Sequence, residues 1–125
     1  MSKRDRASPM SLTVQDMHQH VIDLCSKHEI ACTWCQRPSQ AWAAKDFEEI
    51  CIPPIKSPIS YATALHEIGH ILGRYQRSSD SMVREHWAWQ WAKRNALIWT
   101  PVMDRCADSS LGFAAKAAHP VPARA

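Results

Sequence analysis

Five residues near the middle of the chain, His66-Glu67-Ile68-Gly69-His70, form an H-E-x-x-H motif. On an α-helix, residues four positions apart lie on one face about one turn apart, so the two imidazoles can bind a single ion. Glu67 lies about 100° around the helix, which places it beside a metal-bound water rather than on the metal. Zn²⁺ lowers the pKa of such a water to about 7, so a nearby carboxylate can take its proton. The motif therefore predicts a zinc hydrolase site with His66 and His70 as ligands and Glu67 as general base.

The residues around the motif favour this interpretation over an ordinary amphipathic helix that carries two histidines by chance. Tyr61-Ala62-Thr63-Ala64-Leu65 precedes the motif and Ile71-Leu72 follows it, so the helix is mostly apolar and should be buried. Two imidazoles and a carboxylate on a buried helix are costly unless a partner satisfies them. A metal ion would satisfy all three groups.

The size and charge of the chain restrict the remaining possibilities. A chain of 125 residues with 46% hydrophobic and 22% charged residues is expected to form one domain with a modest core. The net charge of +3 is small, and the basic residues are spread along the chain, so direct nucleic-acid binding is not expected. Six tryptophans could anchor the core or form an aromatic surface for a partner.

The ends of the chain and its cysteines predict a cytoplasmic protein. The charged start, Met1-Ser2-Lys3-Arg4-Asp5-Arg6, is not followed by the apolar run of a secretory signal, and no segment has the length needed to span a bilayer. The five cysteines are then expected to be reduced thiols. We expect a disordered lead over residues 1–10, one zincin-like metallopeptidase domain over 11–112 and a flexible tail over 113–125.

Hydrophobic spacing and turn residues predict an α+β fold, in which a small antiparallel sheet packs against a zincin-like helical core. The helices are expected at about 11–29, 59–72, 81–98 and 101–110, and the strands at about 31–35, 40–44 and 47–52. Ser11 is the candidate N-cap of the first helix. Its three histidines, His18, His20 and His28, are expected to be solvated.

Cys32 and Cys35 form a C-x-x-C pair, which is found in zinc sites and redox sites. A structural zinc site would need a second pair of ligands, and no matching pair exists outside the helical motif. A redox pair usually opens a helix after a strand, which this stretch does not suggest. The favoured interpretation is that one or both are strand residues packing as small apolar groups.

The third metal ligand decides which class of zinc enzyme the motif belongs to, since a catalytic zinc has three protein ligands and one open position. A metzincin would continue to a third histidine, but the chain matches that pattern only through Gly73 and has Gln76 at the ligand position. A peptide deformylase would use an upstream cysteine. Cys51 lies only fifteen residues before His66, and the glycine-rich motif of that class is missing.

A glutamate on the following helix, the gluzincin arrangement, is the favoured third ligand. Glu85 follows His70 by fifteen residues, which allows a loop and a returning helix. It shares a helical stripe with Trp89, Ala92 and Ala96, which points it inward, and an inward carboxylate needs a partner. The other interpretation is a surface carboxylate paired with a nearby arginine, Arg84 or Arg77. Asp80 is a weaker candidate ligand, since it is shorter and helix capping explains it.

With these features the chain resembles the ImmA/IrrE family of small zinc peptidases. The resemblance covers about residues 47–101. It consists of a short strand ending in proline (Glu49-Ile50-Cys51-Ile52-Pro53), a helix with H-E-x-G-H, and a second helix with Glu85 ahead of Trp91-Ala92. It implies that His66, His70 and Glu85 bind zinc and that Glu67 is the general base.

The family also implies a biological setting, namely a cytosolic regulatory protease encoded by a phage, another mobile element or a bacterium. Some members cleave helix-turn-helix repressors, so a protein or peptide substrate such as a repressor is expected. Two departures from the family pattern concern the second helix. His86 follows Glu85 where the family usually has alanine, which makes His86 a rival ligand. The family helix usually ends in a Leu-Leu-Met-Pro-like sequence, whereas this chain has Leu97-Ile98-Trp99-Thr100-Pro101.

A different class of function uses the same scaffold without catalysis. In this alternative the zinc is structural, and the tryptophan-rich helix 81–98 is a surface for binding a regulatory partner. If the protein is an enzyme, Tyr75 or Arg74 is a candidate for stabilising the oxyanion, because both lie close to the motif in sequence.

Overall fold

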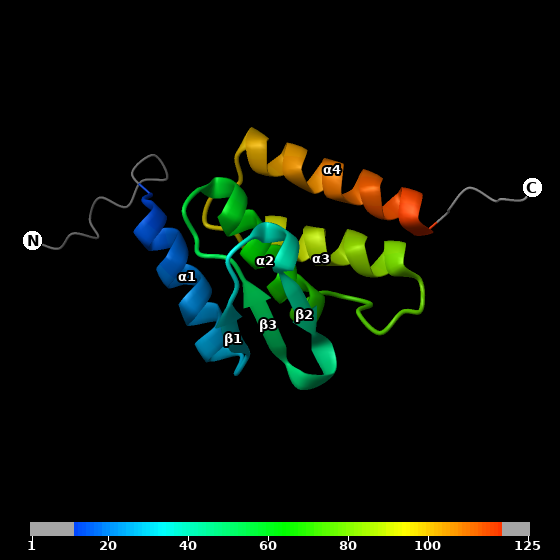
Figure 1. Ribbon diagram of the computed structural model, residues 1–125, viewed down its shortest axis with the longest axis horizontal. Coiled ribbons are helices and arrows are strands. Elements are labelled where there is room, and N and C mark those ends of the chain that lie inside the picture. The colour runs from blue at the N-terminus through cyan, green and yellow to red at the C-terminus, as the bar shows by residue number, and fades with distance from the viewer. Residues whose placement is uncertain (1–11, 119–125) are drawn as a thin grey trace, which may run out of the picture.

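The computed structural model describes residues 12–118 and shows an α+β fold, which confirms the predicted class (Figure 1). The described helices are α1 (Val14–Lys27), α2 (Pro58–Leu72), α3 (Ser81–Asn95) and α4 (Pro101–Ala118). The strands are β1 (Ala31–Trp34), β2 (Trp42–Ala44) and β3 (Glu49–Ile52), with short 3₁₀ turns η3 (Pro38–Gln40) and η4 (Lys45–Phe47) between them.

The three strands form a mixed sheet with the order β1-β3-β2. β2 and β3 are antiparallel neighbours joined by η4, and Glu48 closes this hairpin in the left-handed region at φ 50°. β1 pairs with β3 in parallel, with Thr33 opposite Cys51. The prediction of an antiparallel sheet is therefore wrong for β1. Its neighbour in the sheet is β3 rather than β2, the next strand in sequence, and β3 runs in the same direction as β1.

Local signals in the sequence explain where the helices begin. Ser57 caps α2 by accepting a hydrogen bond from the Ser60 main-chain N–H, and Pro58 occupies the first turn, where a missing N–H costs nothing. Asp80 caps α3 in the same way through Met82. Thr13 caps α1 with a reciprocal bond to Asp16, so the described helix begins after this residue.

The ends of the chain bear on three predicted features. α4 continues to Ala118 rather than ending near residue 110, so the stretch predicted as the start of a tail is helical to that point. The candidate cap Ser11, the predicted lead over 1–10 and the end of the predicted tail, 119–125, lie outside the described residues. Within residues 12–118, no helix is long and apolar enough to cross a membrane.

The motif helix α2 lies at the centre of the molecule and packs against α1, α3, α4 and strands β2 and β3 (Figure 1). Its central side chains are buried together with residues from every neighbouring element. The fully buried larger members of this core are Val21, Ile50, Ile52, Tyr61, Leu65, Ile68 and Met103. A helix in this position exposes its polar groups only where a neighbouring element leaves space.

Gly69, the glycine of H-E-x-G-H, sets the distance between α2 and α3. A side-chain carbon at this position would collide with the main-chain oxygen of Ala88 on α3. The absence of a side chain therefore lets the two helices touch through their backbones. Glu85 lies three residues before Ala88, almost one turn away, so the same close approach brings it next to the histidines of α2.

Candidate metal centre

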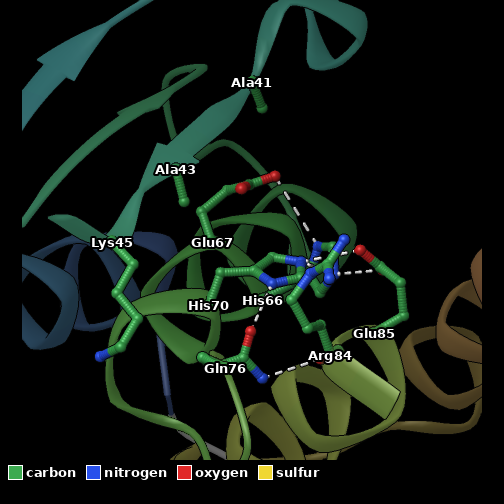
Figure 2. A pocket seen from close by; sticks show the side chains of 9 residues that line it. All are labelled: Ala41, Ala43, Lys45, His66, Glu67, His70, Gln76, Arg84 and Glu85. Atoms are coloured by element: carbon green, nitrogen blue, oxygen red, sulfur yellow. Dashed lines mark hydrogen bonds and ion pairs between the residues drawn. The ribbon is translucent and has the colours of Figure 1, made fainter. Parts of the chain in front are cut away.

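α2 and α3 bring the two motif histidines and the predicted third ligand together. The Nε2 atoms of His66 and His70 are 3.1 Å apart. One carboxylate oxygen of Glu85 lies 2.9 Å from His66 Nε2, and the other lies 2.8 Å from His70 Nε2. Figure 2 shows the three side chains converging between the helices. His66, His70 and Glu85 are also the one group among the described residues that could hold a metal ion through three or more histidine, cysteine or acidic side chains.

Gln76 fixes the orientation and the protonation of the His70 ring. Its amide nitrogen donates hydrogen bonds to the main-chain oxygens of Arg74 and Arg84, at 3.1 and 2.8 Å. Its amide oxygen therefore faces His70 Nδ1, 2.9 Å away, and must accept a hydrogen from it. In neutral His70 the lone pair is then on Nε2, the atom that points at His66 and Glu85.

The ring of His66 is held by aromatic stacking. It lies nearly parallel to the ring of Trp89, with 4.2 Å between centroids and 10° between planes. Trp89 is itself fixed, since it is buried and its indole N–H donates to the hydroxyl of Ser110 on α4. α4 thus supports the candidate metal centre without contributing a ligand to it.

The two histidines and Glu85 interact as oppositely charged groups, and this interaction shifts the pKa of His70 and that of Glu85. Burial opposes the charged form of His70, but the hydrogen bonds and charge of Glu85 outweigh it and raise the pKa of His70. Burial would also raise the pKa of Glu85, yet hydrogen bonds from His66 and His70 and their positive charge lower it far below its usual range. The centre therefore stabilises a positive charge between the imidazoles and the carboxylate.

The donor set fits a divalent cation of the zinc type. With Nδ1–H of His70 given to Gln76, the Nε2 lone pair faces a carboxylate oxygen at 2.8 Å, which is repulsive unless a proton or a cation lies between them. Ligand atoms about 2.0–2.1 Å from a tetrahedral zinc would be about 3.3 Å apart. The observed separations of 2.8–3.1 Å are within a few tenths of an ångström of this spacing.

Glu67 is placed beside the three ligands rather than among them. Its carboxylate lies 3.7 Å from His66 Nδ1, on the other side of that ring from Glu85, and only 8% of the residue is exposed. Burial raises the pKa of Glu67, and the neighbouring histidines offset part of that effect. In Figure 2 its carboxylate lies below Ala41 and beside Ala43. A buried carboxylate with a raised pKa is well suited to accept and return a proton.

A cavity of about 420 Å³ lies over the centre and is bounded by three elements. The segment around β2 forms one wall, α2 the floor and the start of α3 the opposite wall. The lining residues are Ala41, Ala43, Lys45, His66, Glu67, His70, Gln76, Arg84 and Glu85 (Figure 2). All four predicted site residues line this one cavity.

The rival ligands lie elsewhere. Asp80 accepts the Met82 N–H as the cap of α3, and exposed His86 packs edge-on against Trp87. Cys51 is buried on β3 beside Cys35. None of the three lines the cavity, so among the candidates considered only Glu85 is placed to complete the set.

The C-x-x-C pair is divided between two places in the fold. The thiol of Cys32 donates to the Thr33 main-chain oxygen and interacts with the thiol of Cys25 on α1, whereas the thiol of Cys35 donates to the Arg37 main-chain oxygen and interacts with that of Cys51 on β3. The interaction with Cys25 lowers the pKa of Cys32 despite burial. All four thiols are free. The two thiols of the C-x-x-C pair therefore have different thiol neighbours, and the packing role expected for them stays a prediction.

Two other groups of residues differ from expectation. Tyr75 and Arg74, the candidate oxyanion residues, both contact Trp87 and do not line the cavity. Within α3, Trp89 is 4% exposed and the other two tryptophans are partly covered. The exposed tryptophans of the described chain are instead Trp34 and Trp42, at the end of β1 and the start of β2.

Three cavity residues, Gln76, Lys45 and Arg84, were not found by sequence reasoning. Gln76 was considered only as a failed metzincin ligand, although the spacing His70-x-x-Gly73-x-x-Gln76 was the signal that it returns to the site. Gly73 allows this return, since an added side-chain carbon would come within 3.0 Å of the Trp87 oxygen. No local pattern marked Lys45 or Arg84.

Comparison of the chain with protein-family models, with curated proteins and with solved structures finds no match in any of the three.

Proposed function

We propose that the protein is a zinc-dependent metallopeptidase with a zincin-like core. The observation that carries the proposal is the convergence of His66 Nε2, His70 Nε2 and Glu85 on one point, with Glu67 beside it at the floor of an open cavity. Two imidazoles and one carboxylate are a frequent ligand set of catalytic zinc, and they leave a coordination position open. A bound zinc ion would polarise a carbonyl group and lower the pKa of a water molecule at the site to about 7.

The side chains around the candidate metal site have separate roles in the proposed hydrolysis. Glu67 accepts a proton from the attacking water, whose oxygen adds to the carbonyl carbon of the scissile bond. Glu67 then returns the proton to the leaving amine nitrogen as the carbon–nitrogen bond breaks. Gln76 and Trp89 hold the His70 and His66 rings in the orientation that this chemistry needs.

A peptide is the substrate that the cavity wall favours. β2 is an edge strand, so one side of its backbone has no partner in the sheet, and Ala41 and Ala43 line the cavity from this segment. An extended peptide can bind to such an edge by main-chain hydrogen bonds. The small alanine side chains leave room for it above Glu67.

The proposal includes the ImmA/IrrE-like relationship and the setting that it implies. It is supported by the order of β3, α2 and α3 and by the position of Glu85 beside the histidines. On this basis the substrate would be a protein in the cytoplasm, such as a transcriptional repressor. The exposed surface of α3 offers little support for the alternative of a tryptophan-rich binding helix, since Trp89 is buried against His66.

Metal content is the first test. Purified protein should contain about one equivalent of zinc, and His66→Ala should lose it, because removal of one ligand from a three-ligand set leaves too weak a site. Elemental analysis after dialysis measures both. The matched control is His28→Ala, which removes an exposed histidine of the α1 C-terminus. Iron as the bound metal would contradict the proposal, since the same donor set also suits Fe(II) oxygenases.

Catalysis is the second test. Glu67→Gln keeps the shape of the side chain but cannot accept a proton, so it should retain zinc and lose about 10²–10⁴-fold in hydrolysis rate. Mass spectrometry of a peptide library incubated with the zinc protein reports cleavage. Glu29→Gln, which changes an exposed glutamate outside the cavity, is the matched control. Cleavage by Glu67→Gln at the unchanged rate would exclude the assigned role.

A further inference from the structure

Arg84 brings a positive charge into the cavity that no carboxylate of the described chain neutralises. Its guanidinium donates to the main-chain oxygen of Ser78, and none of the ion pairs among residues 12–118 includes it. Glu67 and Glu85 line the same cavity, but Glu85 is bonded to both histidines. By contrast, Arg77 is paired with Asp46 at 3.2 Å.

Arg84 is also held in place before any ligand arrives. Its main-chain N–H donates to the Asp80 oxygen at 3.2 Å, its main-chain oxygen accepts from Gln76 at 2.8 Å, and its side chain is tied to Ser78. Figure 2 shows the side chain rising from the start of α3 alongside the three converging ligands. A group fixed in this way loses little conformational entropy on binding.

The chemistry of a guanidinium determines what it would bind. Its five N–H donors form a planar fork that matches the two oxygens of a carboxylate. Lys45 on the opposite wall is a poorer candidate, because its ammonium is turned away from the histidines and donates to the Ile71 oxygen at 2.8 Å (Figure 2). Arg84 is therefore the cavity residue best placed to recognise an anion.

We infer that Arg84 binds a carboxylate of the substrate, so that the peptide cleaved carries an acidic group beside the scissile bond. This specificity rests on the proposed function and names the substrate class of the same site. The carboxylate could belong to an aspartate or glutamate side chain or to the C-terminus of the peptide. In each case Arg84 contributes to substrate binding rather than to the movement of protons.

Zinc-chelating hydroxamates test the recognition without requiring hydrolysis. The probes are the monohydroxamates of straight-chain dicarboxylic acids of increasing length, each compared with the analogue whose free carboxylate is an amide. In the zinc-loaded protein, the acid should bind about tenfold or more tightly than the amide at the length that reaches Arg84. Isothermal titration calorimetry gives both affinities.

Three variants separate recognition from general effects of charge and folding. Arg84→Gln should reduce the acid-to-amide ratio to about one, and Arg84→Lys should leave an intermediate ratio because it keeps the charge but not the fork. Arg77→Gln removes the same charge from the loop before α3, outside the cavity, and should leave the ratio unchanged. Circular dichroism melts identify any variant that fails to fold. If Arg84→Gln fails to fold, the acid-to-amide ratio of Arg84→Lys is compared with that of the wild type instead.

Peptides distinguish the two sources of the carboxylate. Cleavage that is lost on changing glutamate to glutamine near the cut indicates an acidic side chain, and cleavage that is lost on C-terminal amidation indicates the terminus. Equal binding of acid and amide probes at every length overturns the role of Arg84 while leaving the peptidase proposal intact. Failure of every hydroxamate to bind overturns the zinc site and the inference together.

Discussion

α2 takes part in two buried networks that both contain histidine, and they differ in how their hydrogen bonds are satisfied. Near its start, the Tyr61 hydroxyl accepts from the Leu97 main-chain N–H at 2.9 Å and lies 2.6 Å from His20 Nδ1. The hydroxyl therefore donates its hydrogen to His20 Nδ1, so the three polar groups that meet at this hydroxyl are complementary. Near its end, the Nε2 atoms of His66 and His70 and the carboxylate of Glu85 point at one another instead, and the Nε2 lone pair of neutral His70 faces a carboxylate oxygen.

The difference separates a structural network from a candidate functional one. The junction of Tyr61 ties α1, α2 and the loop before α4 together, and it leaves nothing for a ligand to satisfy. The candidate metal centre is complete only when a cation or protons lie between its three groups. A buried arrangement of this kind is costly in free energy, so it indicates a function. Complementary hydrogen bonds around Tyr61 indicate a structural role, whereas the groups that converge without complementary donors at Glu85 indicate a binding site.

The pKa shifts of the two histidines express the same contrast. Burial lowers the pKa of His20, and the more distant charge of Asp23 offsets only part of this effect. Burial also opposes the charged form of His70, but its contact with Glu85 reverses the result. Burial alone therefore does not distinguish the two networks, whereas the partner of each ring does.

Replacing Gln76 tests whether the metal centre depends on the groups that orient its ligands. Gln76→Leu removes the acceptor for His70 Nδ1–H, so the ring loses its fixed orientation and tautomer. Zinc affinity should fall about 10–100-fold, the usual cost of losing a partner of a metal-bound histidine. Competition with a chromophoric chelator measures the dissociation constant.

The control for this variant lies in the other network, near the start of α2. Tyr61→Phe leaves His66, His70, Glu85 and Gln76 unchanged and should bind zinc with the affinity of the wild type. If Gln76→Leu also retained full affinity, the orienting role of the amide would be excluded.

The same Tyr61→Phe variant should instead change the free energy of unfolding. It removes the acceptor of the Leu97 N–H and the donor to His20, so two hydrogen bonds are lost, each worth about 1 kcal/mol. Urea unfolding of the metal-free protein measures the loss. A loss of zinc affinity with unchanged stability would reverse the distinction between the two networks.

More of the candidate site than of the sheet could be predicted from the sequence, because the site residues lie on helices, where spacing along the chain fixes which side chains share a face. The i, i+4 relation of His66 and His70 holds on any α-helix, and a stripe that includes Trp89 points Glu85 inward. Strand pairing depends on which segments meet in space, and three short strands do not specify this. The parallel pairing of β1 with β3 was therefore missed.

Residues that act through tertiary contacts were also beyond the reach of sequence patterns. His20 was expected to be solvated, but its partner Tyr61 is forty-one positions away and only the packing of α1 on α2 brings them together. Gln76 and Arg84 acquire their positions from a loop whose path depends on the close approach of the helices at Gly69 and Gly73. The spacing of residues along one helix predicts a pair of metal ligands, whereas the residues that orient these ligands can be identified only from the fold.

The smallest expected effect concerns acid stability at the Tyr61 junction. Because burial lowers the pKa of His20 in the folded state, the unfolded chain binds more protons than the folded one as the pH falls below about 6.5. Folding is therefore weakened on acidification from that pH down to the lowered pKa. Glutamine can still accept from the Tyr61 hydroxyl but cannot be protonated, so His20→Gln should lose less stability than the wild type between pH 7.5 and pH 5. Parallel urea titrations of the metal-free proteins, with His28→Gln as the control on α1, measure the difference. A gap between wild type and His20→Gln that does not change with pH would show that the ring is not held neutral by its burial beside Tyr61.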